Sequence, residues 1–369
     1  MYVVPFNLAL LPIEGERFPW RSHTSLEYKA VSALSRLDGM MIASAKSNLF
    51  WLTWLMKEAQ CSNVIEGTVT TFDEIMGENA GVVVPLERRD DVSEVLNYHN
   101  AMIIGIEMIE QGYPLSLSVI KSLHAKLLDG NRGANKNPGQ FRQTQVHIGM
   151  PGSSMKQASY VPPNPIYIQD LLDNLIVFLS REDINPITRT AIMHAQFELI
   201  HPFLDGNGRM GRLLISLFLT YQKVLNNPCF YMSAYLQRHR TQYYDSLSKI
   251  SKEGDWDSWL TFFLEAVIEH SRSNADLLVQ MTHLYEKSKA DFSMATNSSY
   301  AIGVLDYVFT KPIFSIPDML KNATPRMTKQ VAIQVINKLI SAGLIEKIVE
   351  GKGRRPAVYK FSNLLRLLS

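Results

Sequence analysis

The chain has 369 residues, of which 46% are hydrophobic and 20% are charged, and its formal net charge is +2. This length supports a large core and two or three domains. The small net charge excludes a protein held to nucleic acid or membrane by overall charge alone. The two cysteines, Cys61 and Cys229, lie far apart between apolar residues, which predicts buried free thiols rather than a structural zinc site.

The N-terminal part predicts an extended segment followed by helices. Residues 1–11 lack the basic lead and the small-residue cleavage site of a signal peptide, and no apolar run in the sequence reaches membrane-spanning length. We therefore expect a cytoplasmic protein with no membrane partner. Prolines and glycines predict an extended strap over residues 1–19. Apolar residues at helical spacing predict helices over 25–50 and 52–65.

The middle of the chain predicts a helical core. Thr71 with Glu74 has the pattern of a capping box, which predicts a short helix there. Longer helices are expected over residues 90–110, 118–128, 166–179, 188–200 and 213–221. Either Ser116 or Ser118 is expected to cap the second of these. His124 lies among leucines on that helix with no accompanying acid or nucleophile, so we expect it to be structural.

Residues 135–163 differ in composition from the helices around them. They are rich in Gly, Asn, Pro and Ser, and they contain two short β runs at 146–149 and 160–163. Two such runs around a Gly-containing tip predict a β-hairpin.

Residues 201–212, with the sequence HPFLDGNGRMGR, form a polar loop between two apolar helices. Gly206 and Gly208 stand where the second helix begins and leave its backbone N–H groups uncovered. Such a helix start binds anions. Arg209 and Arg212 are three positions apart, so they share a helix face and can converge on a polyphosphate.

The same loop carries a carboxylate and a base. Asp205 is a natural ligand for the magnesium that a nucleotide brings, and the pKa of a histidine such as His201 suits proton abstraction near neutral pH. The loop matches the signature HPFx(D/E)GNGRxxR at every specified position. The chain thereby resembles the Fic family, most of whose members transfer AMP from ATP to a hydroxyl group of a protein.

The resemblance implies a role for each loop residue. His201 deprotonates the Ser, Thr or Tyr hydroxyl of the target, and Asp205 holds Mg²⁺ between the α- and β-phosphates of ATP. Asn207 and the neighbouring backbone N–H groups stabilise the α-phosphate in the transition state. The nucleotide-binding residues expected from the motif are Gly206, Asn207, Gly208, Arg209, Met210, Gly211 and Arg212.

Two tyrosines beyond the loop are also expected to bind the nucleotide. Tyr243 and Tyr244 resemble a Tyr-Tyr pair that lies near adenine in relatives. A purely structural role is the alternative for Tyr244.

Residues 62–67, SNVIEG, resemble the inhibitory motif (S/T)xxxE(G/N) of Fic proteins, with Ser62, Glu66 and Gly67 at its specified positions. In the family, this glutamate reaches the second motif arginine, which here is Arg212. A carboxylate in that place satisfies the guanidinium and occupies the space of the ATP γ-phosphate. We therefore predict an ion pair between Glu66 and Arg212 in the resting protein.

The hairpin also has a counterpart in the family. Residues 141–163 resemble the Fic flap, FRxxxVxIG…YVPP, and we call them the flap. In the family, the flap adds a segment of the target protein as an edge strand, which uses backbone hydrogen bonds. We expect a target protein to bind here; the alternative is a structural hairpin without a partner.

The C-terminal part predicts a separate module. A polar helix over 276–291 serves as a linker, and helices follow over 300–309, from 315 and over 328–342, with strands at 344–348 and 357–361. Three helices and a hairpin with a basic tip resemble a winged helix. Lys352, Arg354 and Arg355 at this tip are candidates for contact with DNA phosphates, and a protein contact surface is the alternative.

The expected fold is mainly α, with a Fic helical core, a β-hairpin flap and a C-terminal winged-helix domain. The expected divisions are an N-terminal helical region over 1–110, a catalytic core over 111–275, and a linker helix with the winged helix over 276–369. The expected activity is AMP transfer from ATP to a protein hydroxyl, including the protein's own, under inhibition by Glu66. A homodimer is expected from the resemblance alone.

Three alternatives remain open. A phosphotransferase branch of the family has a lysine where this chain has Gly208, so Gly208 favours AMP transfer. The reverse reaction, removal of AMP, would use Glu66 to activate a water molecule. A DNA-binding regulator that merely senses nucleotide would not need the base His201.

Overall fold

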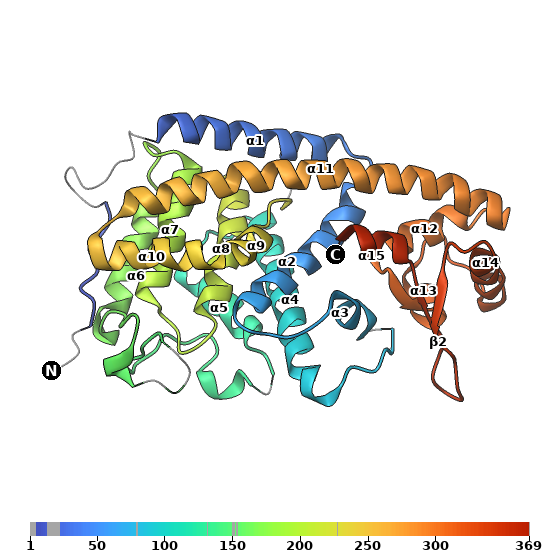
Figure 1. The fold of residues 1–369 in the computed structure, drawn as a ribbon, viewed down its shortest axis with the longest axis horizontal. Helices are drawn as coiled ribbons and strands as arrows, with labels where there is room; N and C mark the ends of the chain where they lie inside the picture. Colours follow the sequence, from blue (N-terminus) through green and yellow to red (C-terminus); the bar gives the residue numbers. More distant parts are fainter. Residues whose placement is uncertain are drawn as a thin grey trace.

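The structure is a computed structural model that describes residues 5–12, 23–78, 80–130, 132–149, 152, 154–226 and 228–368. Helices dominate it, and the longest, α11 (Trp256–Thr296), runs along the molecule from the core to the C-terminal module (Figure 1). The other helices before the C-terminal module are α1 (Thr24–Ala43), α2 (Ser47–Ile65), α3 (Phe72–Glu78), α4 (Arg89–Glu110), α5 (Leu117–Leu127), α6 (Ile168–Leu179), α7 (Pro186–Ile200), α8 (Asn207–Tyr221), α9 (Ser233–Arg238) and α10 (Arg240–Glu253).

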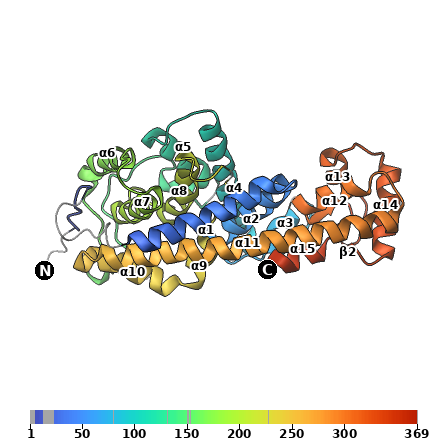
Figure 2. The same ribbon diagram turned by 90° about the horizontal axis from the view of Figure 1, so that it is seen from above.

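The long helices form the frame of the core. In both ribbon views α1 lies beside α11 (Figures 1 and 2). The buried faces of these helices and of α7 and α8 join one continuous hydrophobic cluster, which includes Leu34, Phe197, Phe218 and Trp259. This packing holds α7 and α8, and therefore the loop between them, in the middle of the molecule.

The N-terminal elements differ from the prediction at one point. A single helix was expected over 25–50, but the helix ends at Ala43 and a new one begins at Ser47. Ser44 adopts an extended conformation, which no helical period reveals. Of the predicted strap, residues 5–12 form neither helix nor strand, and Phe6 N donates to Val161 O at 2.9 Å. Residues 1–4 and 13–19 lie outside the described residues.

Several local predictions are confirmed. Thr71 and Glu74 form the reciprocal capping box, with Thr71 N to Glu74 Oε2 at 2.8 Å and Glu74 N to Thr71 Oγ1 at 3.2 Å. Ser116 rather than Ser118 caps α5. Cys61 and Cys229 are buried free thiols.

The flap is less regular than a full hairpin. Its described residues form one antiparallel bridge, between Ile148 and Tyr160, and no longer strand. Ile148 N donates to Tyr160 O at 2.8 Å. The single bridge leaves Ile148 37% exposed at the surface.

The C-terminal module combines short helices with a small sheet. Its elements are α12 (Ala301–Thr310), β1 (Ile313–Ser315), α13 (Ile316–Asn322), α14 (Lys329–Ser341), β2 (Glu346–Val349), β3 (Val358–Lys360) and α15 (Ser362–Leu368). The sheet is antiparallel in the order β1-β3-β2, and Tyr359 pairs with Phe314 on one side and Lys347 on the other. The sequence did not predict β1 or α15.

The expected boundary at 275/276 lies inside the 41-residue α11, so one continuous helix joins the core to the module. Two side chains also connect the sheet to the N-terminal region. Lys360 pairs with Asp73 of α3, and Arg355 Nη2 donates to Gly81 O at 3.1 Å.

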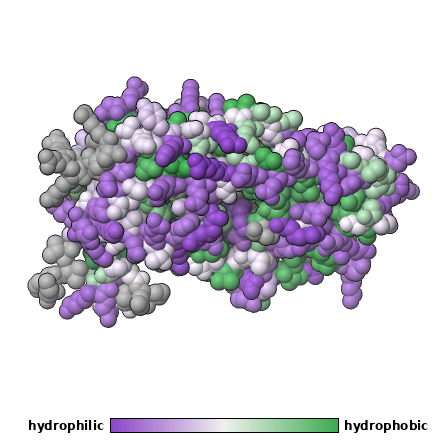
Figure 3. All heavy atoms as spheres, turned by 45° about the horizontal axis from the view of Figure 1, so that its top comes forward, coloured by the Kyte–Doolittle hydropathy of each residue, from purple (hydrophilic) through white to green (hydrophobic). Residues whose placement is uncertain are grey.

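The surface is mixed in character. On the face shown in Figure 3, hydrophilic residues cover most of the area and hydrophobic ones form separate patches. Among the described helices, none combines the length and the apolar character needed to cross a membrane.

Candidate active site

The loop between α7 and α8 depends on two left-handed residues. His201 ends α7 with φ of +51°, and Gly206 precedes α8 with φ of +77°. Glycine adopts this conformation freely, but a histidine there is strained and must be held by its surroundings. Its backbone N–H donates to Phe197 O at 3.0 Å. The turn at His201 ends α7 and begins the loop that leads into α8.

Arg142 of the flap holds the start of the loop. The side chain is 2% exposed, and its Nε donates to His201 O at 2.8 Å. Its other nitrogens donate to the carbonyls of Pro163 at 2.6 Å, Thr144 at 3.2 Å and Ile200 at 3.4 Å. Burial lowers the pKa of Arg142 to about 10. This guanidinium therefore joins both ends of the flap to the backbone of the catalytic loop.

His124 holds the other end of the loop. Its Nδ1 accepts a hydrogen bond from Gly139 N at 2.9 Å, so Nε2 carries the proton and donates to Asp205 O at 2.9 Å. The ring stacks on Phe203 with 3.6 Å between centroids. Burial lowers the pKa of His124 to about 4, which keeps it neutral. The structural role expected for His124 is confirmed.

Asn207 closes the loop on itself. Its Oδ1 accepts from Phe203 N at 2.8 Å, and its Nδ2 donates to Phe203 O at 2.9 Å. The amide is 2% exposed. Both polar atoms of this side chain are thus used to shape the loop.

The surroundings of His201 keep its imidazole uncharged. Burial lowers the pKa of its imidazole to about 4. At neutral pH the ring is therefore uncharged, and with this pKa it is a weaker base than an imidazole in water.

The predicted ion pair between Glu66 and Arg212 is confirmed. Arg212 is 2% exposed, and its Nη2 lies 2.6 Å from Glu66 Oε1. Ser62 completes the contact, because its Oγ accepts from Arg212 Nε at 2.9 Å and its carbonyl accepts from Nη2 at 2.9 Å. Burial alone would raise the pKa of Glu66, but the Arg212 guanidinium holds it below its ordinary value. The carboxylate is therefore ionised at neutral pH.

Two glycines allow this contact. Gly67, with φ of +96°, ends α2 directly after Glu66, as predicted. At Gly208, a Cβ atom would lie 2.3 Å from Glu66 Oε1 and 3.0 Å from Arg212 Nη1. The absence of a side chain at 208 lets the Glu66 carboxylate lie against the start of α8, where the sequence predicts an anion site.

Arg209 is held by two carboxylates. Its Nη1 lies 3.0 Å from Glu94 Oε2 and its Nη2 lies 3.3 Å from Asp205 Oδ1. Glu94 belongs to α4, more than a hundred residues earlier in the chain, and no sequence pattern identified it. Asp205 also accepts from Gly206 N at 2.6 Å, and its side chain is 43% exposed.

The two predicted adenine-binding tyrosines lie in different surroundings. Tyr243 is 1% exposed, and its hydroxyl is 2.8 Å from His194 Nε2. This burial argues against direct contact with a nucleotide. Tyr244 is 41% exposed, with its ring centroid 5.0 Å from that of Tyr243. Tyr244 is thus the better placed of the two to contact a ligand.

Met210 and Gly211 belong to the packing of the loop. Met210 is fully buried. At Gly211, a Cβ atom would lie 2.3 Å from Glu198 Oε1, a carboxyl of α7 that the sequence did not single out. Burial raises the pKa of Glu198 to about 8, and its Oε1 has no hydrogen-bond partner in the described part of the chain.

Comparison with known proteins decides the family. The sequence profile of the Fic/DOC family matches residues 114–219, and that of the Fic/DOC family N-terminal region matches residues 25–107. The chain belongs to the Fic/DOC family.

Solved structures of the Fic family share its fold. One is a Fic family protein from Desulfovibrio desulfuricans G20, with a TM-score of 0.58 and 20% identity over 92% of this chain and 96% of that one. Fic-1 from Caenorhabditis elegans gives a TM-score of 0.55 and 22% identity over 72% of this chain and 75% of that one.

The similar curated Fic proteins are named adenylyltransferases. The chain is 27% identical to protein adenylyltransferase Fic of Drosophila grimshawi over 278 residues, which cover 70% of this chain and 52% of that protein. It is 28% identical to protein adenylyltransferase fic-1 of C. elegans over 203 residues, which cover 53% and 35% respectively. The chain therefore spans about a third to a half of the length of these relatives.

Proposed function

We propose that this Fic protein transfers AMP from ATP to a hydroxyl group of a protein side chain, and that Glu66 inhibits the transfer. Two observations together carry the proposal. His201 is uncharged at one end of the loop, and the Glu66 carboxylate lies against the N-terminus of α8 at the other end. The names of the relatives support the same reaction.

The residues divide the reaction between them. His201 takes the proton of the target hydroxyl, whose oxygen attacks the α-phosphorus of ATP while the bond to pyrophosphate breaks. The backbone N–H groups at the start of α8 stabilise the charge that develops on the α-phosphate oxygens. Arg209 and Arg212 hold the β- and γ-phosphates.

Asp205 fits the role of a magnesium ligand. Mg²⁺ in nucleotide sites takes one or two carboxylates and completes its shell with phosphate oxygens and water. Asp205 is such a single, partly exposed carboxylate beside the phosphate-binding arginines. The described residues contain no cluster of three acidic, His or Cys side chains that could hold a metal unaided, so the ion would arrive with ATP and neutralise charge on its phosphates.

Inhibition follows from the position of Glu66. While Glu66 is paired with Arg212, this guanidinium cannot bind the γ-phosphate. ATP then binds with its phosphates misplaced for transfer. ATP competes for Arg212 because its γ-phosphate is a replacement partner. Breaking a buried pair from one side alone is costly, so we expect exchange of partners rather than simple loss of one.

The flap is the proposed site of the target. Arg142 and the Ile148–Tyr160 bridge hold it over the catalytic loop, and the exposed Ile148 marks an edge to which an extended target segment can add. Such pairing through the backbone selects an extended conformation more than a sequence.

Mass spectrometry after incubation with isotopically labelled ATP and Mg²⁺ tests the proposal. We expect a gain of AMP on the protein itself, faster by about tenfold or more in Glu66→Ala, because about 1.4 kcal/mol of relieved misplacement suffices for tenfold. His201→Ala should abolish the gain while ATP still binds. A gain of phosphate would instead identify a phosphotransferase, and near-normal labelling of His201→Ala would remove His201 from the mechanism.

A second candidate is the removal of AMP. The ionised Glu66 carboxylate at the site could activate a water molecule to attack the AMP–protein bond. In that case AMP-modified protein would lose AMP in the parent and retain it in Glu66→Ala.

A further inference from the structure

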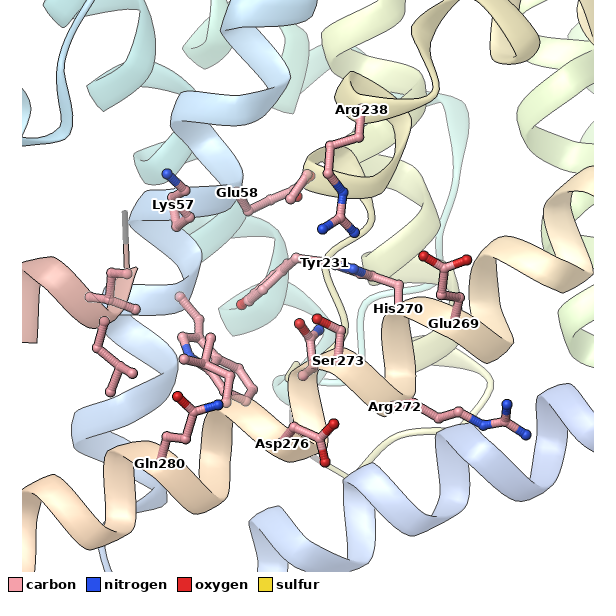
Figure 4. A pocket seen from close by; sticks show the side chains of 16 residues that line it. Lys57, Glu58, Tyr231, Arg238, Glu269, His270, Arg272, Ser273, Asp276 and Gln280 are labelled. Atoms are coloured by element: carbon pink, nitrogen blue, oxygen red, sulfur yellow. The ribbon is translucent and has the colours of Figure 1, made fainter.

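A cavity of about 610 Å³ lies between α2, α9, α11 and α15 (Figure 4). This volume is within the range of small-molecule sites. Its described lining contains no residue of loop 201–212, so it is separate from the nucleotide site. It borders the same helix, α2, that carries Glu66.

One side of the cavity is apolar. Trp54 of α2, Leu277 of α11 and Leu368 of α15 line it, and Trp54 is 4% exposed. These side chains come from distant parts of the chain and leave the space between them unfilled. They would contact the apolar body of a ligand.

A buried tyrosine lines the same space. Tyr231 is 4% exposed, and its hydroxyl has no hydrogen-bond partner among the residues that the structure describes. Figure 4 shows this hydroxyl directed into the gap between α2 and α11. The oxygen itself exposes less than 1 Å², so a ligand in the cavity would contact the ring of Tyr231 rather than its hydroxyl.

The charge at the cavity favours a ligand with a single negative group. Arg238 of α9 is an exposed residue of the lining (Figure 4), and in the described structure no acidic side chain forms an ion pair with it. The nearby carboxylate of Glu58 is already bound to Tyr98 and Ser233. Lys57 and Arg272 add positive charge, whereas Glu269 and Asp276 add negative charge, which disfavours a polyanion.

We propose that this cavity binds a small organic monoanion with an aromatic or aliphatic body. The anionic group contacts Arg238, and the body packs on Trp54, Leu277 and Leu368.

A pair of fluorescent probes tests this with the full chain. 8-Anilino-1-naphthalenesulfonate (ANS) has an aromatic body and one sulfonate, and N-phenyl-1-naphthylamine is the same body without the charge. ANS should bind saturably at one molecule per chain and more tightly than the uncharged probe. Excess ATP with Mg²⁺ should not displace it.

Substitutions locate the probe. Arg238→Gln should raise the Kd of ANS about tenfold, as expected for the loss of a charge-assisted hydrogen bond, and leave the uncharged probe unaffected. Arg181→Gln is the matched control, an arginine outside the cavity whose loss should change neither probe. Equal affinity of the parent and Arg238→Gln for ANS, displacement by ATP, or no saturable binding would overturn the proposal.

Discussion

At the scale of single residues, Glu198 is an acid with an unusual environment next to the catalytic loop. Its carboxyl lies against Gly211, and burial raises its pKa to about 8, from an ordinary 4.5. Between these two values the unfolded chain has released the proton that the folded chain keeps. The folded state therefore loses stability as pH rises from 4.5 to 8, and the loss is constant above pH 8.

Glu198→Gln should remove this loss. We expect the variant to be more stable than the parent by on the order of 1 kcal/mol at pH 7, since one pKa unit corresponds to about 1.4 kcal/mol and Glu198 as a whole residue is only half-buried, which reduces the effect. The gain should be small at pH 5 and largest at pH 8. Thermal melting of both proteins across this range measures it, with the exposed Glu253→Gln as control. A gain of the same size at pH 5 and pH 8 would contradict the shifted pKa.

Gly208 offers a second test at this scale. A Cβ there would lie 2.3 Å from Glu66 Oε1, so Gly208→Ala must displace the carboxylate from Arg212. The displaced atom ends a flexible side chain, so the cost is the lost contact with the buried Arg212, and we expect Gly208→Ala to lower the stability of the parent by about 1–3 kcal/mol. In Glu66→Ala the same change should cost much less, since the clashing atom is gone. Melting temperatures of the four proteins form a double-mutant cycle. Equal losses in both backgrounds would show that Glu66 and Gly208 are not in contact.

At the scale of elements, α2 presents one row of residues spaced by four: Trp54, Glu58, Ser62 and Glu66. Residues at this spacing lie one above another on a helix. Glu58 binds the backbone N–H and hydroxyl of Ser233 on α9, while Ser62 and Glu66 bind Arg212 on α8. The row therefore fixes the position of α2 relative to two other helices, and it is this helix as a whole that presents Glu66.

Ser62→Ala tests the row. The hydroxyl of Ser62 accepts from Arg212 Nε, whereas its carbonyl keeps the bond to Nη2. Removing one of several bonds should free Arg212 in part, so we expect AMP transfer to rise by a few fold, about the effect of 0.5–1.5 kcal/mol, and less than in Glu66→Ala. Rates of self-labelling with ATP measure the order of the two variants. A Ser62→Ala rate at or below that of the parent would exclude Ser62 from the inhibitory contact.

The elements also show which features a sequence can predict. The capping box of Thr71 and Glu74 and the helix stop at Gly67 depend on neighbouring residues, and both were predicted. The Glu66–Arg212 pair was predicted because the inhibitory motif at 62–67 and the loop motif at 201–212 resemble family motifs whose glutamate and arginine are in contact. Arg142 stands in the flap motif, but its role, like that of Glu94, comes from packing between distant segments, so the sequence did not assign it.

At the scale of the whole molecule, α11 joins the catalytic core to the C-terminal module without a break. The module also contacts the N-terminal region through Lys360 with Asp73 and Arg355 with Gly81. Arg355 thus has a structural partner, which the sequence could not show. Lys352 and Arg354 are exposed at the same tip, and the structure describes no ion pair for either.

Because Arg355 has a structural partner, Lys352 and Arg354 are the residues to substitute in a test for DNA binding. If the module binds duplex DNA as a winged helix does, Lys352→Gln with Arg354→Gln should weaken binding and lower the slope of log K against log salt by about 2, because each phosphate contact contributes about 0.9. The matched control is Lys249→Gln with Lys252→Gln, which removes the same charge from exposed positions on α10. Fluorescence anisotropy with a labelled duplex at several salt concentrations measures the slopes. Equal slopes for the two double variants, or no binding by the parent even at low salt, would assign the tip to a protein contact instead.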